Sequence, residues 1–193
     1  MKIRVLGLGN TLMSDDGFGP YVVRVLDAFY EFPDDVQLID GGKPGLDLTP
    51  LLLDARAVVV VDTVKAPGAA GDIRVYDRAD ILRSAPPARV SPHDAGLKEA
   101  LLTAGAAGSG PSTLKLFGVV PEWVGAGVHL SRNVKSAVAP VIGLIITRLE
   151  RLGVHARLRP TARRPAAWQP GEVFPGPVGS IADARCRETG NEP

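Results

Sequence analysis

The sequence has very little cysteine and almost no excess of charge of either sign. Its 193 residues include a single cysteine, Cys186, which excludes an internal disulfide and, so close to a polar carboxyl end, is not expected to be a nucleophile. The formal net charge is +1, which leaves no excess basic surface for holding nucleic acid or an acidic membrane by charge alone. We therefore expect a cytoplasmic protein that binds neither.

Long hydrophobic runs are also missing. The longest, residues 137–146, contains Pro140 and is about half of the roughly 20 residues that span a bilayer. The apolar run that follows Lys2 and Arg4 ends at Gly9, too soon for the centre of a signal peptide. With 45% hydrophobic and 22% charged residues, the chain fits one globular α/β-sized domain with an ordinary core.

Common catalytic and nucleotide-binding motifs are absent as well. There is no Gly-x-Ser-x-Gly elbow and no His-Glu-x-x-His pair, so hydrolysis would have no evident serine or cysteine nucleophile. Gly7, Gly9 and Gly17 partly follow a dinucleotide-binding pattern, but Leu12 stands where its third glycine belongs. A nucleotide-binding domain is therefore the weakest of the alternatives.

The sequence does contain a regular alternation of apolar strands and amphipathic helices. Strands buried on both faces are predicted from runs rich in valine and leucine at 2–8, 36–40, 57–61 and 114–120, with a weaker edge strand at 72–77. Helices are predicted from Gly17 to before Pro33, over 46–53, from Ser91 to Gly105, and from Ser131 to Gly153 with a kink at Pro140. The order predicts a doubly wound α/β fold, in three layers, with a twisted, mostly parallel sheet of about five strands and helices on both faces.

The last part of the chain differs in composition. From Ala156 to Pro193 it is rich in proline and arginine and poor in apolar residues. We predict a folded domain over residues 1–155 and a mostly disordered tail over 156–193. The alternative for this tail is a docking segment in which Trp168 and Phe174 anchor on a partner.

Three residues stand where such a fold would gather them into a metal site. Asp16 follows the first strand, Asp62 ends another and His93 opens a helix. Ligands of a doubly wound sheet bind beyond the carboxyl ends of its strands, and the loops bearing Asp16 and Asp62 flank that crevice if the second and third strands lie on opposite sides of the first. Two carboxylates and one imidazole leave coordination positions open, as in catalytic metal sites.

Each of these residues also has a plainer interpretation. Asp15 or Asp16 could simply cap the helix that follows. Asp62 could only hydrogen-bond the turn after its strand, and His93, which follows a proline, could be a surface or capping residue. The residues alone leave these alternatives open.

Taken in order, several short segments resemble the hydrogenase maturation endopeptidases. They are Gly7-Leu8-Gly9-Asn10 with Asp15-Asp16-Gly17, Asp40-Gly41-Gly42 with Gly45, Val61-Asp62, Ser91-Pro92-His93 and Gly118-Val119-Val120-Pro121-Glu122. The resemblance covers about residues 1–153 and implies a twisted sheet flanked by helices, with one antiparallel edge strand. It assigns the metal-binding and catalytic positions to Asp16, Asp62 and His93. It assigns substrate recognition to Asp40, Gly41 and Gly42, a loop whose plainer role is a tight turn.

The resemblance implies an endopeptidase that removes a carboxyl-terminal extension from the large subunit of a nickel-iron hydrogenase once nickel has been inserted. The substrate would supply the nickel, and the three predicted ligands would complete its coordination. We expect a monomer whose partner is the hydrogenase large-subunit precursor. An alternative that uses the same ligands is a non-catalytic module that senses or delivers nickel.

Overall fold

The computed structural model describes residues 2–41, 47–83 and 94–163. Gly42, His93 and the part of the predicted tail beyond residue 163 lie outside these ranges. None of the helices within them is long and apolar enough to cross a membrane.

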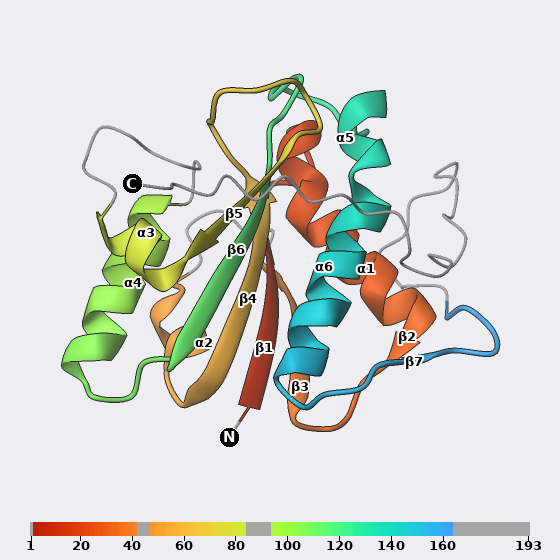
Figure 1. Cartoon of the computed structure of the whole chain (residues 1–193). Helices are drawn as coiled ribbons and strands as arrows, with labels where there is room; N and C mark the ends of the chain where they lie inside the picture. Colours follow the sequence, from red (N-terminus) through yellow and green to blue (C-terminus); the bar gives the residue numbers. More distant parts are fainter. Residues whose placement is uncertain (1, 42–46, 84–93, 164–193) are drawn as a thin grey trace, which may run out of the picture.

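A five-stranded sheet in the order β3-β1-β4-β6-β5 forms the centre of the molecule (Figure 1). Its strands are β1 (Lys2–Leu8), β3 (Val36–Gly41), β4 (Ala55–Thr63), β5 (Ile73–Asp77) and β6 (Thr113–Val119). Neighbouring strands run parallel except β5, which pairs antiparallel with β6 at one edge. The second and third strands of this sheet along the chain, β3 and β4, therefore lie on opposite sides of β1, the order that the site hypothesis requires.

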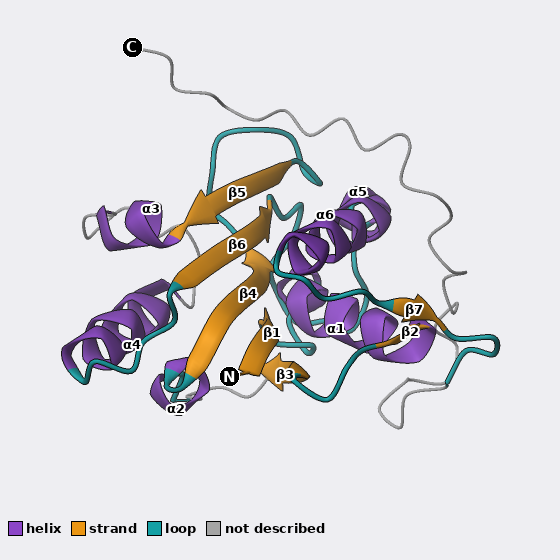
Figure 2. Cartoon of the chain, turned by 60° about the horizontal axis from the view of Figure 1, so that its bottom comes forward, coloured by secondary structure: helices purple, strands orange, loops and turns teal. Residues whose placement is uncertain are grey.

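Helices cover both faces of the sheet (Figure 2). One face carries α1 (Phe18–Phe29), α5 (Arg132–Ser136) and α6 (Val138–Arg151), and the other carries α2 (Thr49–Leu52), α3 (Arg78–Arg83) and α4 (Asp94–Ala106). Successive residues of β4 enter opposite cores, Val59 with α1 and α6, Val60 with α2 and α4. The predicted three-layer α/β fold with an antiparallel edge strand is confirmed.

The helix predicted from Ser131 to Gly153 is in fact two helices. α5 ends at Ser136 and α6 begins at Val138, so the interruption precedes Pro140. Pro140 lies in the first turn of α6, where its missing N–H needs no helical partner. In one continuous helix, its ring would clash with the carbonyl of Ser136.

Two helices on the other face also differ from the prediction. α2 is a single turn, shorter than the predicted range of 46–53. α3 was not predicted, and a reciprocal capping box starts it: the Asp77 N–H donates to Asp80 Oδ2 at 2.8 Å and the Asp80 N–H to Asp77 Oδ1 at 3.0 Å. The bond from the Asp77 backbone holds the pKa of the Asp80 carboxyl below its ordinary value, against the opposing effect of burial, and Arg83 contributes in the same direction.

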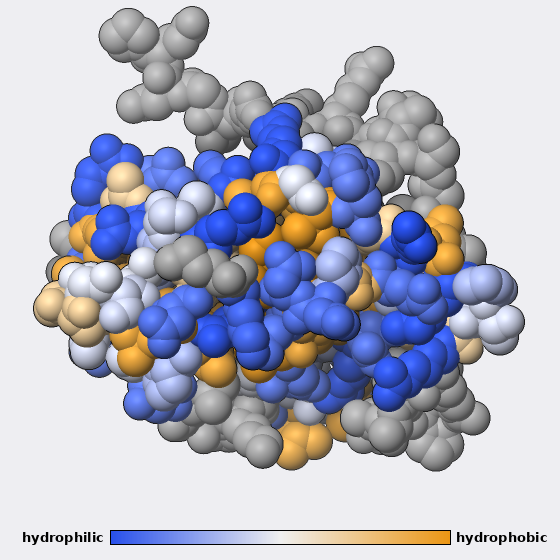
Figure 3. Space-filling model, turned by 90° about the horizontal axis from the view of Figure 1, so that it is seen from below, coloured by the Kyte–Doolittle hydropathy of each residue, from blue (hydrophilic) through white to orange (hydrophobic). Residues whose placement is uncertain are grey.

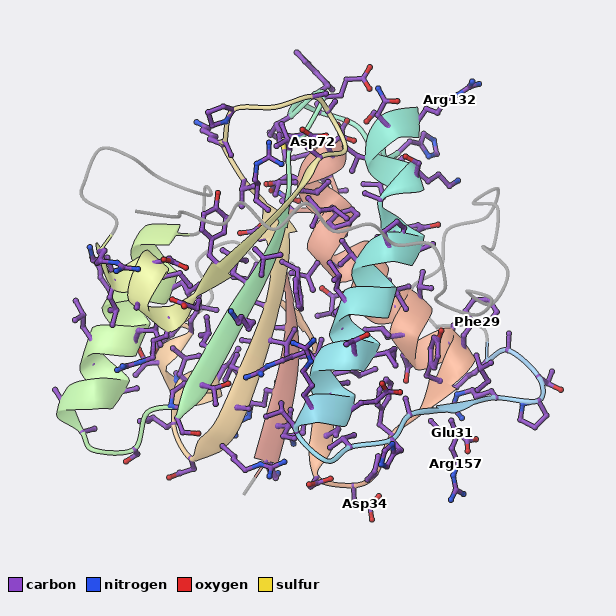
Figure 4. The ribbon with its side chains drawn as sticks, viewed as in Figure 1. Phe29, Glu31, Asp34, Asp72, Arg132 and Arg157 are labelled. Carbon is purple, nitrogen blue, oxygen red and sulfur yellow. The ribbon has the colours of Figure 1, made fainter. Side chains whose placement is uncertain are left out.

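Secondary structure is present beyond residue 155, the predicted end of the domain. β7 (Arg157–Leu158) pairs antiparallel with β2 (Tyr30–Glu31), the extension of α1, and Glu31 lies beside Arg157 (Figure 4). The Arg159 N–H donates to the Phe29 carbonyl at 2.8 Å. The first residues of the predicted tail therefore pack on the domain. The sequence could not predict this strand, because a two-residue strand that pairs with a distant segment has no local periodicity.

The amino ends and the carboxyl ends of the parallel strands lie on opposite sides of the molecule (Figure 1). The face at the amino ends of the parallel strands, seen from below, is mostly hydrophilic (Figure 3). The opposite edge, at the top of Figure 1, carries the loops that follow β1, β4 and β6. Asp16 and Asp62 lie at this carboxyl edge.

Candidate functional site

Asp16 and Asp62 come from neighbouring strands and are both buried. Asp16 lies in η1 (Asp15–Gly17), the short 3-10 turn between β1 and α1, and Asp62 is the penultimate residue of β4. β1 and β4 pair in parallel, so both residues emerge at the same edge of the sheet. Asp16 is 5% exposed and Asp62 is 1% exposed. Buried carboxylates are uncommon unless they are hydrogen-bonded or bind a cation.

Thr63 links the two aspartates. Its hydroxyl donates to Asp16 Oδ1 at 3.2 Å, and its backbone N–H donates to Asp62 Oδ1 at 2.8 Å. The Asn10 N–H donates to Asp16 Oδ2 at 2.8 Å. Each oxygen of Asp16 thus receives one hydrogen bond and keeps a further lone pair. Sequence reasoning missed Thr63, although its position directly after Asp62 at a strand end was a usable signal.

Asp15, next to Asp16 in the chain, has a different role. Its carboxylate is fully buried, and Oδ2 accepts hydrogen bonds from the Glu122 and Trp123 N–H groups, both at 2.9 Å. Oδ1 accepts from the Ser131 N–H at 2.6 Å. Three backbone donors from the loop after β6 suit an ionised acceptor. Asp15 therefore fastens that loop to η1.

Neither aspartate caps α1, which corrects the plainer interpretation of this pair. Gly17 occupies the N-cap position of α1, and no side chain makes a capping hydrogen bond there. Asp15 and Asp16 instead point their carboxylates to two different elements, the loop after β6 and the end of β4.

The loop after β6 pairs with the loop after β1. The Ser14 N–H donates to the Gly127 carbonyl at 2.9 Å, and the Gly127 N–H donates to the Leu12 carbonyl at 3.0 Å. Ser14 has a φ of 52°, a conformation that residues other than glycine seldom adopt. A Cβ on Gly127 would lie 2.4 Å from Ser14 Oγ, so a larger residue there would make the Ser14 hydroxyl turn away.

Gly7 of the apparent dinucleotide pattern and Gly19 of α1 are used for packing. A Cβ on Gly7 would lie 2.3 Å from the Gly19 carbonyl oxygen, and a Cβ on Gly19 would lie 2.2 Å from the carbonyl oxygen of Leu8. These contacts let the start of α1 lie directly against β1 and β4, which sets the position of η1. Close packing thus accounts for Gly7 without a phosphate ligand.

The predicted substrate-recognition segment starts at the end of β3. Asp40 accepts hydrogen bonds from Arg24 of α1, at 3.1 Å from Nε and 3.0 Å from Nη2. Gly41 is the last residue of β3 and is buried, whereas Gly42 lies outside the described residues. The ion pair ties this end of β3 to α1, and the role of the segment in recognition stays a prediction.

His93 lies outside the described residues. α4 starts at the next residue, Asp94, and leads to the amino end of β6, so it begins on the side of the carboxyl edge (Figure 1). Among the residues that the structure describes, no three histidines, cysteines or acidic residues form a group that could hold a metal ion. The predicted metal site, with two carboxylate oxygens and one imidazole nitrogen as ligands, therefore needs His93 as its third ligand.

Comparison with known proteins decides the family. Residues 20–148 match the family model described as hydrogenase maturation protease. The chain belongs to this family. The hydrogenase expression/formation protein HoxM of Azotobacter vinelandii is 34% identical over 159 residues, which cover 82% of this chain and 77% of that protein. The hydrogenase 2 maturation protease of Escherichia coli is 29% identical over 160 residues, 81% of this chain and 95% of that protein.

Solved structures agree with this assignment. The hydrogenase maturating endopeptidase HybD from E. coli superposes with a TM-score of 0.75 at 29% identity, and the match covers 82% of this chain and 98% of that one. A hydrogenase maturation protease from Thermococcus kodakarensis, at 22% identity and a TM-score of 0.61, shares the fold. The resemblance inferred from the short segments is confirmed, and this hydrogenase maturation protease is a peptidase.

Proposed function

We propose that this peptidase removes the carboxyl-terminal extension of a nickel-iron hydrogenase large-subunit precursor after nickel has been inserted. Its family and the names of its relatives support a role in hydrogenase maturation. One structural observation carries the proposal: Thr63 donates hydrogen bonds to both Asp16 and Asp62 at the carboxyl edge of the sheet. We further propose that it acts as a cytoplasmic monomer.

In this proposal nickel is part of the substrate. Asp16, Asp62 and His93 complete the coordination of nickel already seated in the precursor, so that an empty precursor is not cleaved. Carboxylate oxygens and imidazole nitrogens are ligands that divalent transition metals accept. The donors to Asp16, from Asn10 and Thr63, fix its orientation in the way that outer hydrogen bonds fix metal ligands.

The chemistry follows from the nickel and from the absence of a nucleophile motif. A divalent ion can polarise a scissile carbonyl or lower the pKa of a bound water to about 7. In either route water adds to the carbonyl carbon, the C–N bond breaks and the leaving amine takes up a proton from that water, so no serine or cysteine nucleophile is needed. We propose that the segment Asp40, Gly41 and Gly42 contacts the precursor beside this site.

Substitution of each proposed ligand tests the proposal. Asp16→Asn, Asp62→Asn and His93→Ala should each abolish processing of the nickel-loaded precursor while the circular dichroism spectrum stays that of the wild type. Asp72→Asn is the matched control, because Asp72 is an acidic residue of another loop at the same edge (Figure 4). Full cleavage by any of the three variants would remove that residue from the mechanism.

A further inference from the structure

The loops at the carboxyl edge expose much of the apolar surface of the domain. Seven large hydrophobic side chains are exposed among the described residues, and four of them lie in the two loops that flank η1: Leu12, Trp123, Val124 and Val128. Leu12 is 62% exposed and Trp123 is 63% exposed. The other three lie one each on β5, α4 and β7. We call the four loop residues the apolar shelf.

Backbone hydrogen bonds hold the shelf in place. The loops pair at Ser14 and Val124 and again at Met13 and Gly127. The carboxylate of Asp15 accepts from the backbone of Trp123 itself. Such a surface loses little conformational entropy when a ligand binds to it.

The Trp123 indole lies against Gly125 of the same loop. A Cβ on Gly125 would lie 2.4 Å from Cζ2 of Trp123, so the ring rests on the backbone of Gly125. The indole is nevertheless 63% exposed. Tryptophan contributes large contact areas at binding surfaces and is enriched among the residues that dominate affinity.

The shelf loop is hydrogen-bonded to η1, the turn that also carries Asp16 of the proposed active site. Asp15 binds the shelf loop, and its neighbour Asp16 binds Thr63. An extended polypeptide advances by about 3.3 Å per residue. When its scissile bond lies at Asp16 and Asp62, the residues a few positions away pass over the loops that carry Leu12 and Trp123.

We propose that the apolar shelf binds an apolar segment of the precursor polypeptide beside the scissile bond. This inference rests on the proposed function, because it places the substrate at Asp16. Charge favours a polypeptide over a membrane surface, because the chain has a net charge of +1 and the shelf loop carries both signs: Glu122 precedes Trp123, and Arg132 follows the loop at the start of α5.

Kinetics of two alanine substitutions at exposed apolar residues test the proposal. Trp123→Ala should raise the KM for nickel-loaded precursor about tenfold and leave kcat nearly unchanged, because the shelf holds substrate and not the reacting atoms. Leu102→Ala is the matched control, because Leu102 is 56% exposed on α4 and outside the shelf. A Trp123→Ala enzyme with the same KM as the control would overturn the proposal.

A binding measurement separates this inference from the proposed function. The chain has two tryptophans, Trp123 and Trp168, so a full-length Trp168→Phe protein labelled with fluorotryptophan reports Trp123 alone by fluorine NMR. Unlabelled nickel-loaded precursor should shift or broaden this resonance. If precursor binds and the resonance stays unchanged, the shelf proposal fails. If the resonance responds but no peptide is released, the proposed function fails, and the shelf is shown to contact the precursor without a scissile bond beside it.

The same experiment tests other occupants of the shelf. A Trp123 resonance that moves with protein concentration alone, and does not respond to precursor, would show that a second copy of this chain covers the shelf. A resonance that differs between full-length protein and a variant lacking residues 164–193, again without a response to precursor, would assign the surface to the tail. Either result would overturn the proposal.

Discussion

The hydroxyl of Thr63 donates a hydrogen bond to Oδ1 of Asp16 across 3.2 Å. These residues are far apart in the chain, and the bond connects the turn after β1 with the end of β4. Since the Thr63 backbone also donates to Asp62, one residue orients both of the acidic ligands that we propose. The hydroxyl acts on Asp16 alone, so a substitution can separate the two contacts.

Removal of the Thr63 hydroxyl should slow processing without unfolding the protein. Thr63→Val keeps the shape and the backbone bond to Asp62 but leaves Asp16 Oδ1 without this donor. We expect kcat/KM for the nickel-loaded precursor to fall about 10- to 100-fold, the usual cost of losing an outer contact to a metal ligand. Thr63→Ser, which keeps a hydroxyl, should retain most of the activity. Equal activity of the two variants would contradict the role given to the hydroxyl.

Asp15 should matter for stability more than an exposed acid does. In Asp15→Asn, a side-chain NH₂ group takes the place of one carboxylate oxygen. This group would face a backbone N–H that donates to that oxygen in the wild type, so two donors would meet. We expect the free energy of unfolding to fall by about 1–3 kcal/mol, measured by urea denaturation. Asp34→Asn, on an exposed carboxylate, should cost less than about 0.5 kcal/mol. Similar losses for both variants would argue against a structural role for Asp15.

Two glycine substitutions should have opposite effects on stability. A Cβ on Gly19 would lie 2.2 Å from the Leu8 carbonyl oxygen and 2.4 Å from that of Val61, so Gly19→Ala should destabilise the fold by about 3 kcal/mol. Gly96 in α4 has no atom within 4 Å of such a Cβ. Gly96→Ala should therefore stabilise the protein by about 0.5–1 kcal/mol. Thermal unfolding of the two variants checks both signs.

The capping box of α3 should give a contribution to stability that depends on pH. The pKa of Asp80 is lowered in the folded state by the Asp77 backbone N–H, so its contribution is present above the unfolded pKa of about 3.9 and is lost as the pH falls through the lower folded pKa. Asp80→Asn should cost about 0.5 kcal/mol near neutral pH, a small value because the carboxylate is 38% exposed. As the pH falls below the folded pKa of Asp80, the difference from wild type should vanish.

An exposed aspartate outside a cap provides the control for this measurement. Asp34 lies between β2 and β3 on the surface (Figure 4). Asp34→Asn should leave the unfolding free energy nearly unchanged across the same pH series, followed by urea denaturation. A pH-independent loss in Asp80→Asn would show that the capping geometry, and not the charge, supplies the stability.

Elements with a strong local pattern could be predicted from the sequence. The predicted strand at residues 2–8 coincides with β1, because strands covered on both faces read as continuous apolar runs. The strand predicted at 57–61 is longer at both ends in the structure, where Arg56 and Asp62 interrupt the run. The pair β2 and β7 escaped prediction because two-residue strands have no period to detect.

In the candidate site, too, the contacts that depend on distant parts of the chain could not be predicted. The chain order predicted that Asp16 and Asp62 would reach one edge, since both follow strands that proved to be neighbours. The division of roles between Asp15 and Asp16 could not be predicted, because it depends on a loop more than 100 residues further along the chain. The position of Trp123 against Asp15 is likewise set by tertiary packing.

The dependence of cleavage on nickel tests the central claim most directly. A hydrogenase large-subunit precursor from the same organism, prepared with and without nickel, would be incubated with less than one equivalent of this protein and analysed by intact-mass spectrometry. We expect that the nickel-loaded precursor alone loses a carboxyl-terminal peptide, with several turnovers per enzyme molecule. Equal cleavage of the nickel-free precursor, or no cleavage of either, would contradict this claim.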